Sequence, residues 1–583
     1  MRRCSLASLI LAALLVASPA DAECHLAKFL ELPVTMRGAR PIVSTQIDGK
    51  DAQFILDSGA FFSTLSPASA QTYGLHLTAL PPNFQLRGVN GATSASVATV
   101  RKFGLAGATI PNVEFVVGGT DIGQVGLLGQ NLLGIGDVDY DFRHGAVRLL
   151  RAKGCKIDEL AYWVSDYPVT IIPLEPRSPR QPHTIGTVTL NGVKLRAVFD
   201  TGAPTSVLTL SAARKAGVTP NSPGVVAGGT SFGLGTRSLR TWIATFSRLE
   251  IGSESVPAPK IRFSEVELND GDMLIGADFF LTHHVYVAND AAKMLFTYEG
   301  GPVFGITPTG ATDEKGKPLD LTDRTAEPTN AEGFSRRGAA FASGGNFDAA
   351  IADFDRAIAL APNQAGYFRQ RAAARMANHQ PLLAAADLDK ALAAEPTDIE
   401  SRLMRSRMRL AAHDPAGAGE DIRVLDTELA PSAGERLQLA AMADNAGLLD
   451  VSLANDDAWL KSHPEDAQRP AALNERCWVL GQLNRDLKKA LGDCNAALRA
   501  RPNAAAYLDS RGLIRLRMGD LHGALADYDA ALSLQPRNPW TLYMRSLVKL
   551  KAGDAGGAQA DRSAALAIAP RIGDRAVRLG LEQ

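Results

Sequence analysis

The first half of the sequence repeats itself, and this repeat limits most strongly what the chain can fold into. Residues 46–70, QIDGKDAQFILDSGAFFSTLSPASA, align without a gap with residues 189–213, TLNGVKLRAVFDTGAPTSVLTLSAA, at a constant shift of 143. The copies match again at LLGQNLL (127–133) and LIGADFF (274–280), where the shift is 147. A duplication with a short insertion in the second copy accounts for both matches. It predicts two halves with one common fold.

Two further signals place both copies in the all-β class. Short β-branched runs between residues 42 and 298 alternate with Gly, Asn-Gly and Asp-Gly turns. In each copy a two-residue hairpin turn, Asp48-Gly49 or Asn191-Gly192, precedes an apolar strand that ends in Asp-(Ser/Thr)-Gly-Ala. One Asp-Thr-Gly is a weak signal, because turns are rich in these residues. Two copies in matching surroundings are specific.

This pattern resembles the aspartic peptidases, and in particular their retropepsin-like branch. ILDSGA (55–60) and VFDTGA (198–203) resemble its catalytic loops, and LLGQNLL resembles its hydrophobic-hydrophobic-Gly segment. The resemblance covers about residues 30–300. It implies two all-β retropepsin-like acid protease barrels that form a pseudo-dimer within one chain, with Asp57 and Asp200 as the catalytic pair.

A pair of carboxyl groups explains the chemistry that the resemblance implies. Peptide hydrolysis needs a general base that activates water and a general acid that protonates the leaving amide. Because like charges held close together do not both ionise readily, Asp57 and Asp200 are expected to share one proton. Their apparent pKa values then belong to the pair, and the proton is assigned to neither residue.

The family also implies roles for the residues that follow each aspartate. The hydroxyl groups of Ser58 and Thr201 are expected to cross-link the two loops beneath the carboxyl groups, and Gly59 and Gly202 to allow close approach of backbone amides. Pepsins usually carry a hydroxyl residue at the next position, where this chain has an alanine in each half. The pair is therefore expected to ionise less readily and to work at milder pH than a gastric enzyme. These alanines are Ala60 and Ala203.

Glycine-rich stretches stand where the family places its substrate-covering flaps. They are RGVNGATS (87–94) and AGGTSFGLG (227–235), and a hairpin tip that moves over substrate favours glycine. Val89, Asn90 and Phe232 are the candidates for substrate contact, while an ordinary exposed hairpin is an equal alternative for each. Neither stretch has the tyrosine expected at a pepsin flap.

The composition changes beyond residue 333, where Ala, Leu, Arg and Asp dominate. Prolines recur at spacings of 34, 35, 33, 38, 34 and 34 residues from Pro362 to Pro570, a period that resembles the tetratricopeptide repeat (TPR). Small residues such as Gly338 and Gly512 fall where the two helices of a unit would touch, with Phe354 and Tyr528 between the helices. The unit near residues 433–464 departs from the pattern. We expect an all-α solenoid of about seven helix pairs that binds protein or serves as a spacer or dimerisation element.

The N-terminus has the layout of a cleavable secretory signal. Two arginines, an apolar run and a small-residue A-x-A ending at Ala22 predict export to the periplasm or the exterior. The predicted boundaries are 1–22 for the signal peptide, 23–155 and 156–300 for the two β domains, 301–332 for a flexible linker and 333–583 for the array. An oxidising compartment permits two disulfides among Cys24, Cys155, Cys477 and Cys494, and local pairing is the simplest of the three connectivities.

Charge and motif content argue against several other functions. Lys and Arg number 61 against 62 Asp and Glu, which offers no basic excess for nucleic acid or an anionic membrane. After signal cleavage no segment is long and apolar enough to predict a membrane span. No metal site or cofactor is predicted. Adjacent His283 and His284 are interpreted as structural, because neighbours on a strand point to opposite faces.

The sequence therefore predicts an exported aspartic endopeptidase that acts on protein or peptide, with the array binding substrate or a partner. One alternative pairs each half with its counterpart in a second chain, in an obligate dimer. Another is a non-catalytic protein-binding scaffold whose function lies in the array. Retention of both aspartates and both hydroxyl neighbours favours the enzyme.

Overall fold

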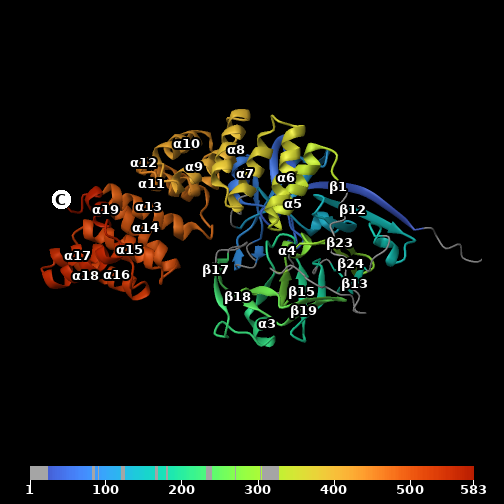
Figure 1. Ribbon diagram of the computed structural model, residues 1–583, viewed down its shortest axis with the longest axis horizontal. Coiled ribbons are helices and arrows are strands. Elements are labelled where there is room, and N and C mark those ends of the chain that lie inside the picture. Colours follow the sequence, from blue (N-terminus) through green and yellow to red (C-terminus); the bar gives the residue numbers. More distant parts are fainter. Residues whose placement is uncertain are drawn as a thin grey trace, which may run out of the picture.

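The chain folds into a β region followed by a helical array (Figure 1). The computed structural model describes residues 24–582 except 82–83, 85, 89–90, 120–124, 165–168, 179–181, 232–238, 269–270, 302–303 and 305–326. The predicted signal peptide and most of the predicted linker lie outside the described residues. Among the helices in the described ranges, none has the length and apolar character of a membrane span.

Within its described residues the first half contains twelve strands and two short helices, and a 3-10 turn follows it at Asp158–Leu160. These elements are β1 (His25–Arg37), β2 (Arg40–Ile47), β3 (Lys50–Leu56), β4 (Thr64–Leu65), α1 (Pro67–Thr72), β5 (Leu77–Ala79), β6 (Leu86–Gly88), β7 (Gly91–Thr93), β8 (Ser96–Leu105), β9 (Ala108–Val117), β10 (Gly126–Leu128), α2 (Gln130–Leu133), β11 (Asp137–Asp141) and β12 (Ala146–Lys153).

The second half has the same order of elements around its aspartate. It comprises β13 (Thr170–Pro173), β14 (Ile185–Leu190), β15 (Val193–Phe199), β16 (Val207–Thr209), α3 (Leu210–Lys215), β17 (Val226–Ser231), β18 (Leu239–Thr245), β19 (Arg248–Ile251), β20 (Glu254–Pro257), β21 (Lys260–Ser264), β22 (Met273–Ile275), α4 (Ala277–Phe280), β23 (His283–Ala288) and β24 (Lys293–Tyr298).

Local sequence explains why the two halves agree. The hairpin turns before β3 and β15 have positive φ at both central residues, 50° and 85° at Asp48-Gly49 and 51° and 80° at Asn191-Gly192, as a type I′ turn requires. In each half the strand that ends at the aspartate pairs in parallel with the strand that contains the two hydrophobic residues of the Gly segment. These pairs are β3 with β10 and β15 with β22. That second strand also pairs antiparallel with the strand after the catalytic loop. The aspartate therefore emerges from the middle of a buried sheet.

A shared sheet joins the halves. Strand β11 of the first half pairs antiparallel with β23 of the second, with Val138 opposite Val287. The order β13-β24-β23-β11-β12-β1 therefore runs across both halves without interruption. A disulfide between Cys24 and Cys155 ties the start of the first half to its end. These links make the β region one pseudo-dimeric body, as the duplication predicts.

The array consists of seven antiparallel helix pairs and a short last helix. The pairs are α5 (Ala331–Ser343) with α6 (Phe347–Leu360), α7 (Ala365–Ala377) with α8 (Pro381–Ala394), α9 (Ile399–Ala411) with α10 (Pro415–Glu428), α11 (Glu435–Asn445) with α12 (Leu449–Ser462), α13 (Arg469–Leu483) with α14 (Leu487–Ala500), α15 (Ala505–Arg517) with α16 (Leu521–Leu534), and α17 (Pro539–Lys551) with α18 (Ala555–Ile568); α19 (Gly573–Arg578) follows.

Small residues bring the helices of a pair together where the sequence predicts it. A Cβ atom at Gly338 would lie 2.9 Å from the ring of Phe354, and one at Gly512 would lie 2.8 Å from the ring of Tyr528. The irregular fourth unit still forms a helix pair, α11 with α12. A second disulfide joins Cys477 of α13 to Cys494 of α14. Both disulfides thus have the local connectivity.

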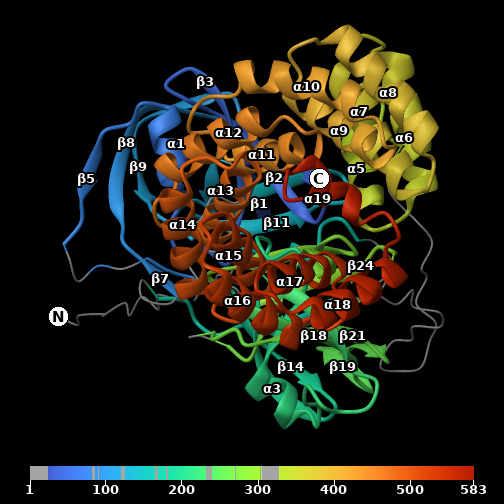
Figure 2. The ribbon, with the colours of Figure 1, turned by 90° about the vertical axis from the view of Figure 1, so that its left-hand side faces the viewer.

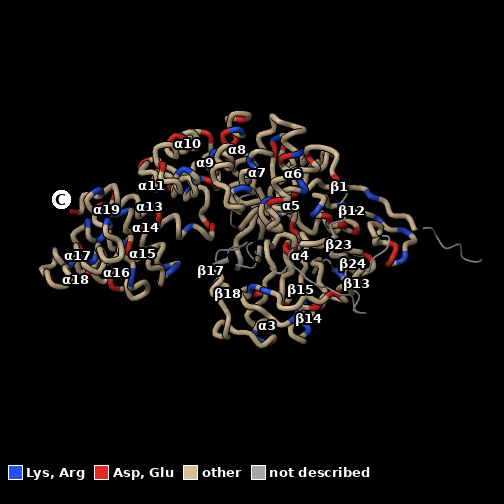
Figure 3. The backbone as a smooth tube through the Cα atoms, viewed as in Figure 1, with Lys and Arg blue, Asp and Glu red and all other residues tan. Residues whose placement is uncertain are grey.

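The array begins against the β region and then arches away from it (Figures 1 and 2). Helix α5 packs on β1, where Ser343 donates a hydrogen bond of 2.6 Å to the carbonyl of Gly38. A second contact is made by the loop between α12 and α13, where the Glu465 carboxylate accepts hydrogen bonds from the side chains of Thr93 and Ser94 beside β7. Acidic and basic residues are interspersed along the array (Figure 3).

Candidate active site

Asp57 and Asp200 lie together at the junction of the two halves. Asp57 follows β3 and Asp200 follows β15, and the two backbone amides are held in the same way, by the carbonyls of Leu128 and Ile275. Both residues are half-buried, whereas the Oδ1 atom of Asp57 is fully buried and has no hydrogen-bond partner among the described residues. The structure therefore brings the predicted pair together within one chain.

Ser58 and Thr201 cross-link the two loops beneath the aspartates. The amide of Ser58 donates to Oγ1 of Thr201 at 3.0 Å, and the amide of Thr201 donates to Oγ of Ser58 at 2.9 Å. Each hydroxyl then donates across the junction, Ser58 to the carbonyl of Phe199 and Thr201 to that of Leu56, at 2.9 and 2.8 Å. Both side chains are buried. Four hydrogen bonds with approximate twofold symmetry fix the separation of the two strands.

Glycine is required at the next position because each aspartate faces the glycine of the other half. A Cβ atom at Gly59 would lie 2.3 Å from Cγ of Asp200, and one at Gly202 would lie 2.3 Å from Cγ of Asp57. No side chain fits in that space. The amides of Gly202 and Ala203 also donate to Oδ1 of Asp200, at 2.9 and 3.3 Å.

Burial and mutual repulsion make the pair hard to ionise. Burial raises the pKa of Asp57 well above its usual value, and the charge of Asp200 raises it further. Burial also raises the pKa of Asp200, although hydrogen bonds from Asp57 and from its own loop amides oppose the shift. Ala60 and Ala203 add no hydroxyl donor that would favour the ionised form. The pair is therefore arranged to keep a proton that the two residues share.

A chain of polar contacts behind the first catalytic loop could not be predicted from the sequence. Gln130, at the start of α2, donates to the carbonyl of Ser58 at 2.7 Å, and Arg177 donates to Oε1 of Gln130 at 2.6 Å. Arg177 also donates to the carbonyl of Pro182 at 2.6 Å. Arg177, which lies between β13 and β14 of the second half, thus supports the Asp57 loop of the first half. No sequence pattern marks Arg177, because it stands in an irregular segment without periodicity.

Ser63 and Ser206, which have no nucleophile motif, have structural partners. Ser63 contacts the side chain of Asn131 at 2.8 Å, and Ser206 contacts that of Asp278 at 2.7 Å. The same hydroxyl groups accept hydrogen bonds from the backbone amides of Gly129 and Gly276. These contacts anchor each Gly segment to the catalytic loop of its own half.

The predicted flap residues Val89, Asn90 and Phe232 lie outside the described residues. Their flanking strands are described: β6 pairs with β7, with Gly88 opposite Gly91, and β17 pairs with β18, with Ser231 opposite Leu239. Substrate contact by the three residues stays a prediction.

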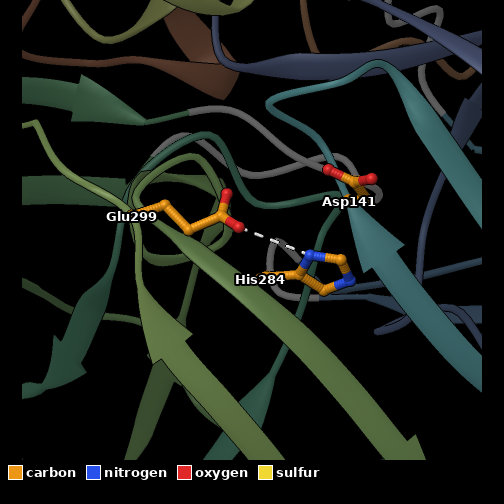
Figure 4. Close-up of side chains that lie close together, drawn as sticks. All are labelled: Asp141, His284 and Glu299. Atoms are coloured by element: carbon orange, nitrogen blue, oxygen red, sulfur yellow. Dashed lines mark ion pairs between the residues drawn. The ribbon is translucent and has the colours of Figure 1, made fainter. Parts of the chain in front are cut away.

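His283 and His284 lie on opposite faces of β23, as expected for neighbours on a strand. His283 contacts Glu254 at 3.0 Å. His284 contacts Asp139 at 2.5 Å, and its other ring nitrogen lies 3.4 Å from Glu299 (Figure 4). Burial alone would lower the pKa of His284, but Asp139, aided by Glu299, raises it to about 10.

One grouping of ligand-type atoms near this histidine was not visible from sequence spacing. Asp141, His284 and Glu299 have nitrogen or oxygen atoms that lie within 4.8 Å of one another (Figure 4). A metal would need a neutral imidazole and available carboxylates, whereas here the raised pKa keeps a proton on His284, and Arg148 binds Asp141 at 3.0 Å. The donor set fits a charge network that links the halves better than a metal centre.

Comparison with known protein families separates the two regions. Residues 43–132 and 186–279 match the aspartyl protease family model, one match for each half. Residues 331–364 match the tetratricopeptide repeat model. No curated protein matches the sequence.

Several solved structures are distantly similar. A chain from the crystal structure of the APC/C hetero-tetramer Cut9-Hcn1 is 16% identical with a TM-score of 0.31, and the match covers 43% of this chain but only 50% of that chain. A tetratricopeptide repeat protein from Parabacteroides merdae ATCC 43184 is 14% identical with a TM-score of 0.33, covering 43% of this chain and 98% of the other. YrrB, described as a TPR protein with an unusual peptide-binding site, is 15% identical with a TM-score of 0.22, covering 37% and 92%.

The family matches fall on the elements that carry the two aspartates and on the first helix pair of the array. The chain therefore combines a tandem pair of retropepsin-like aspartyl protease domains with a tetratricopeptide repeat array.

Proposed function

We propose that the chain is an exported aspartic endopeptidase whose catalytic pair, Asp57 and Asp200, forms within one polypeptide. The observation that carries the proposal is the reciprocal cross-link of Ser58 and Thr201, which holds two carboxyl groups face to face at the end of two buried strands. A pure scaffold has no evident use for two carboxyl groups that oppose each other at an energetic cost.

The chemistry follows from one proton shared between two acids. The ionised carboxyl takes a proton from water, whose oxygen attacks the peptide carbonyl carbon. The protonated carboxyl donates its proton to the leaving nitrogen as the carbon–nitrogen bond breaks. Gln130 and Arg177 act as positioning residues, because they hold the carbonyl of Ser58 and through it the Asp57 loop.

Export and partner binding complete the proposal. Two disulfides are typical of an oxidising compartment and agree with the signal-like residues 1–22, which favours the periplasm or the exterior. The array offers a long surface for a protein substrate or partner. N-terminal sequencing of the protein from a periplasmic extract tests export: a first residue near Glu23 is expected, and an intact Met1 would contradict it.

The activity is tested by cleavage of an unstructured protein with residues 23–583 and with the Asp57→Asn and Asp200→Asn variants. We expect loss of at least about 1000-fold in kcat/KM for each, because neither acid can replace the other. Asp51→Asn, which changes an exposed residue of β3, is the matched control and is expected to keep full activity. Equal activity of all variants would refute the mechanism.

The same proteins test the dimer alternative. Molecular mass in solution, measured at the concentration of the assay, is expected to show that monomers are active. Full activity in only one of the two aspartate variants would instead favour pairing of the unchanged half with its copy in another chain.

A further inference from the structure

The end of the chain does not simply extend the helical stack. A helix added to the stack would meet only the last pair, α17 and α18. Instead, Arg575 of α19 reaches Trp478 of α13, two units back, and the carbonyl of Leu579 accepts a hydrogen bond of 2.7 Å from Arg517 of α15. In Figure 1 α19 lies beside α13, in agreement with the contact between Arg575 and Trp478. The C-terminal segment, residues 572–582, therefore lies across the first helices of three successive units.

Arg575 occupies a pocket built from aromatic and acidic side chains. Its guanidinium group lies 4.6 Å from the ring of Trp478 and 4.6 Å from the ring of Trp540, and these two rings are nearly perpendicular. Burial lowers the pKa of Arg575, whereas the charges of Asp444 and Asp509 oppose that shift. Two aromatic faces and nearby carboxylates are the surroundings that recognise a guanidinium group.

The pocket has polar groups that its present occupant does not use. Oδ1 of Asp509 and Nε1 of Trp540 are both buried without a well-aligned hydrogen bond among the described residues, although Thr541 and Trp540 lie close enough to Asp509 to lower its pKa. Burial raises the pKa of Asp509 to about 6. Poorly aligned hydrogen bonds in a buried site are costly, so the present occupant does not fully satisfy these polar groups. A different peptide could use both groups.

Two more residues of the segment make specific contacts with the array. Ala576, next to the arginine, is fully buried among apolar side chains of the last units. Further on, the carboxylate of Glu582 accepts a hydrogen bond of 2.5 Å from Tyr543 and pairs with Arg562. The surface therefore contacts three residues of the segment: an arginine, the small apolar residue directly after that arginine, and an acidic residue seven positions after it.

We propose that the C-terminal segment is an internal occupant of a peptide-binding site on α13, α15 and α17, and that the site takes an arginine-bearing segment of another protein when the C-terminal segment leaves. Charge complementarity selects this partner, because the site presents carboxylates and two indole rings to a guanidinium group. The inference extends the proposal that the array binds protein and does not depend on peptidase activity.

The test uses a fluorescent peptide that copies residues 570–583, PRIGDRAVRLGLEQ, and full-length protein in the Asp57→Asn background. Anisotropy is expected to show binding at least about tenfold tighter to the Arg575→Ala variant than to the parent, because the variant's own segment no longer competes. Arg571→Ala is the matched control: its side chain is 90% exposed, and binding is expected to equal that of the parent.

Two additional variants keep the inference falsifiable. Glu582→Ala releases this end of the segment while Arg562 and the arginine pocket stay available to the peptide, and it is also expected to strengthen peptide binding. Adding Trp478→Ala to Arg575→Ala is expected to abolish the gain. Equal binding to parent and Arg575→Ala, or undiminished binding of a peptide whose own Arg575 is alanine, would overturn the inference. Neither result bears on the cleavage assay.

Discussion

Ala60 and Ala203 affect the ionisation of the aspartate pair because neither side chain has a hydroxyl group. Burial raises the pKa of both acids, the charge of Asp200 raises that of Asp57 further, and neither alanine supplies a hydroxyl hydrogen bond to the ionised form. The pair should therefore keep its shared proton up to milder pH than a pair that has such donors.

A hydroxyl restored at this position should shift the pH profile of cleavage. Ala203→Ser is expected to move the acidic limb of kcat/KM down by about one pH unit, because a donor stabilises the carboxylate. Ala152→Ser, at an exposed site of β12, is the control. An unchanged limb would contradict the role of the alanines, and a wild-type optimum below about pH 3 would contradict the mild-pH expectation.

At the scale of elements, an arginine–aspartate ladder runs through the array. In six of the seven helix pairs an arginine of the first helix makes a double hydrogen bond to an aspartate of the second. The ladder pairs are Arg337–Asp353, Arg371–Asp387, Arg405–Asp421, Arg476–Asp493, Arg511–Asp527 and Arg545–Asp561. The fourth unit has Leu439 and Asn455 at the corresponding positions, and Asp456 stands one residue later, where other units have an apolar residue such as Phe354. Both carboxyl oxygens of Asp456 are buried without a hydrogen-bond partner among the described residues.

The same substitution should therefore have opposite effects in two units. Asp456→Leu is expected to stabilise the array by about 1–3 kcal/mol at pH 8, because it removes an unpaired buried carboxyl group. Asp387→Leu is expected to destabilise it by about 2 kcal/mol or more, because Arg371 and Arg375 lose their partner. Thermal unfolding followed by the helical circular dichroism signal measures both.

The pH dependence gives the Asp456 prediction a second check. Burial raises the pKa of Asp456 well above its usual value, so its ionisation opposes folding and stability falls as pH rises above that usual value. The gain from Asp456→Leu should accordingly shrink in acid. A destabilised Asp456→Leu protein at pH 8 would refute this account.

At the scale of the whole molecule, buried polar contacts join parts that are distant in sequence. His284 of the second half binds Asp139 of the first across the shared sheet, and Arg143 of the first half donates to the carbonyl of Glu299 while lying 5.4 Å from the ring of Phe341 in α5. The two halves and the start of the array are thereby held in one arrangement.

Removal of the His284 contact should weaken the junction of the halves in a pH-dependent way. The pKa of His284 is raised to about 10, so its stabilisation is full below its usual pKa and is lost as pH rises through about 10. His284→Gln is expected to cost about 2–4 kcal/mol at pH 6, with a difference from wild type that shrinks toward pH 10. His25→Gln, on exposed β1, is the control for thermal unfolding. A difference independent of pH would contradict the assignment.

The array also contacts the first predicted flap. Glu465 accepts a hydrogen bond of 2.6 Å from Ser94 and one of 3.1 Å from Thr93, beside a cavity of about 200 Å³ between the array and the first half. Glu465→Ala is expected to speed amide hydrogen exchange in β6 and β7 by about five- to tenfold, with β2 and β3 unchanged. Glu428→Ala, at an exposed site of α10, should change neither. Unchanged exchange in β6 and β7 would mean that the contact does not restrain the flap.

The sequence by itself determined the features that depend on local or repeated patterns. Two matching loops located Asp57 and Asp200, positive-φ turn residues located the hairpins, and the proline period located the helix pairs. Each signal lies within a few residues of the structure that it specifies, or occurs in more than one copy, so it can be read along the chain.

Only the tertiary structure decided which distant residues meet. Arg177 supports the Ser58 loop through Gln130, and Arg575 returns to Trp478. These pairs have no common period and no turn or helix signal, because their contacts arise only when whole elements pack. The aspartate pair could thus be found in the sequence, whereas the groups that position it and the segment that covers part of the array could not.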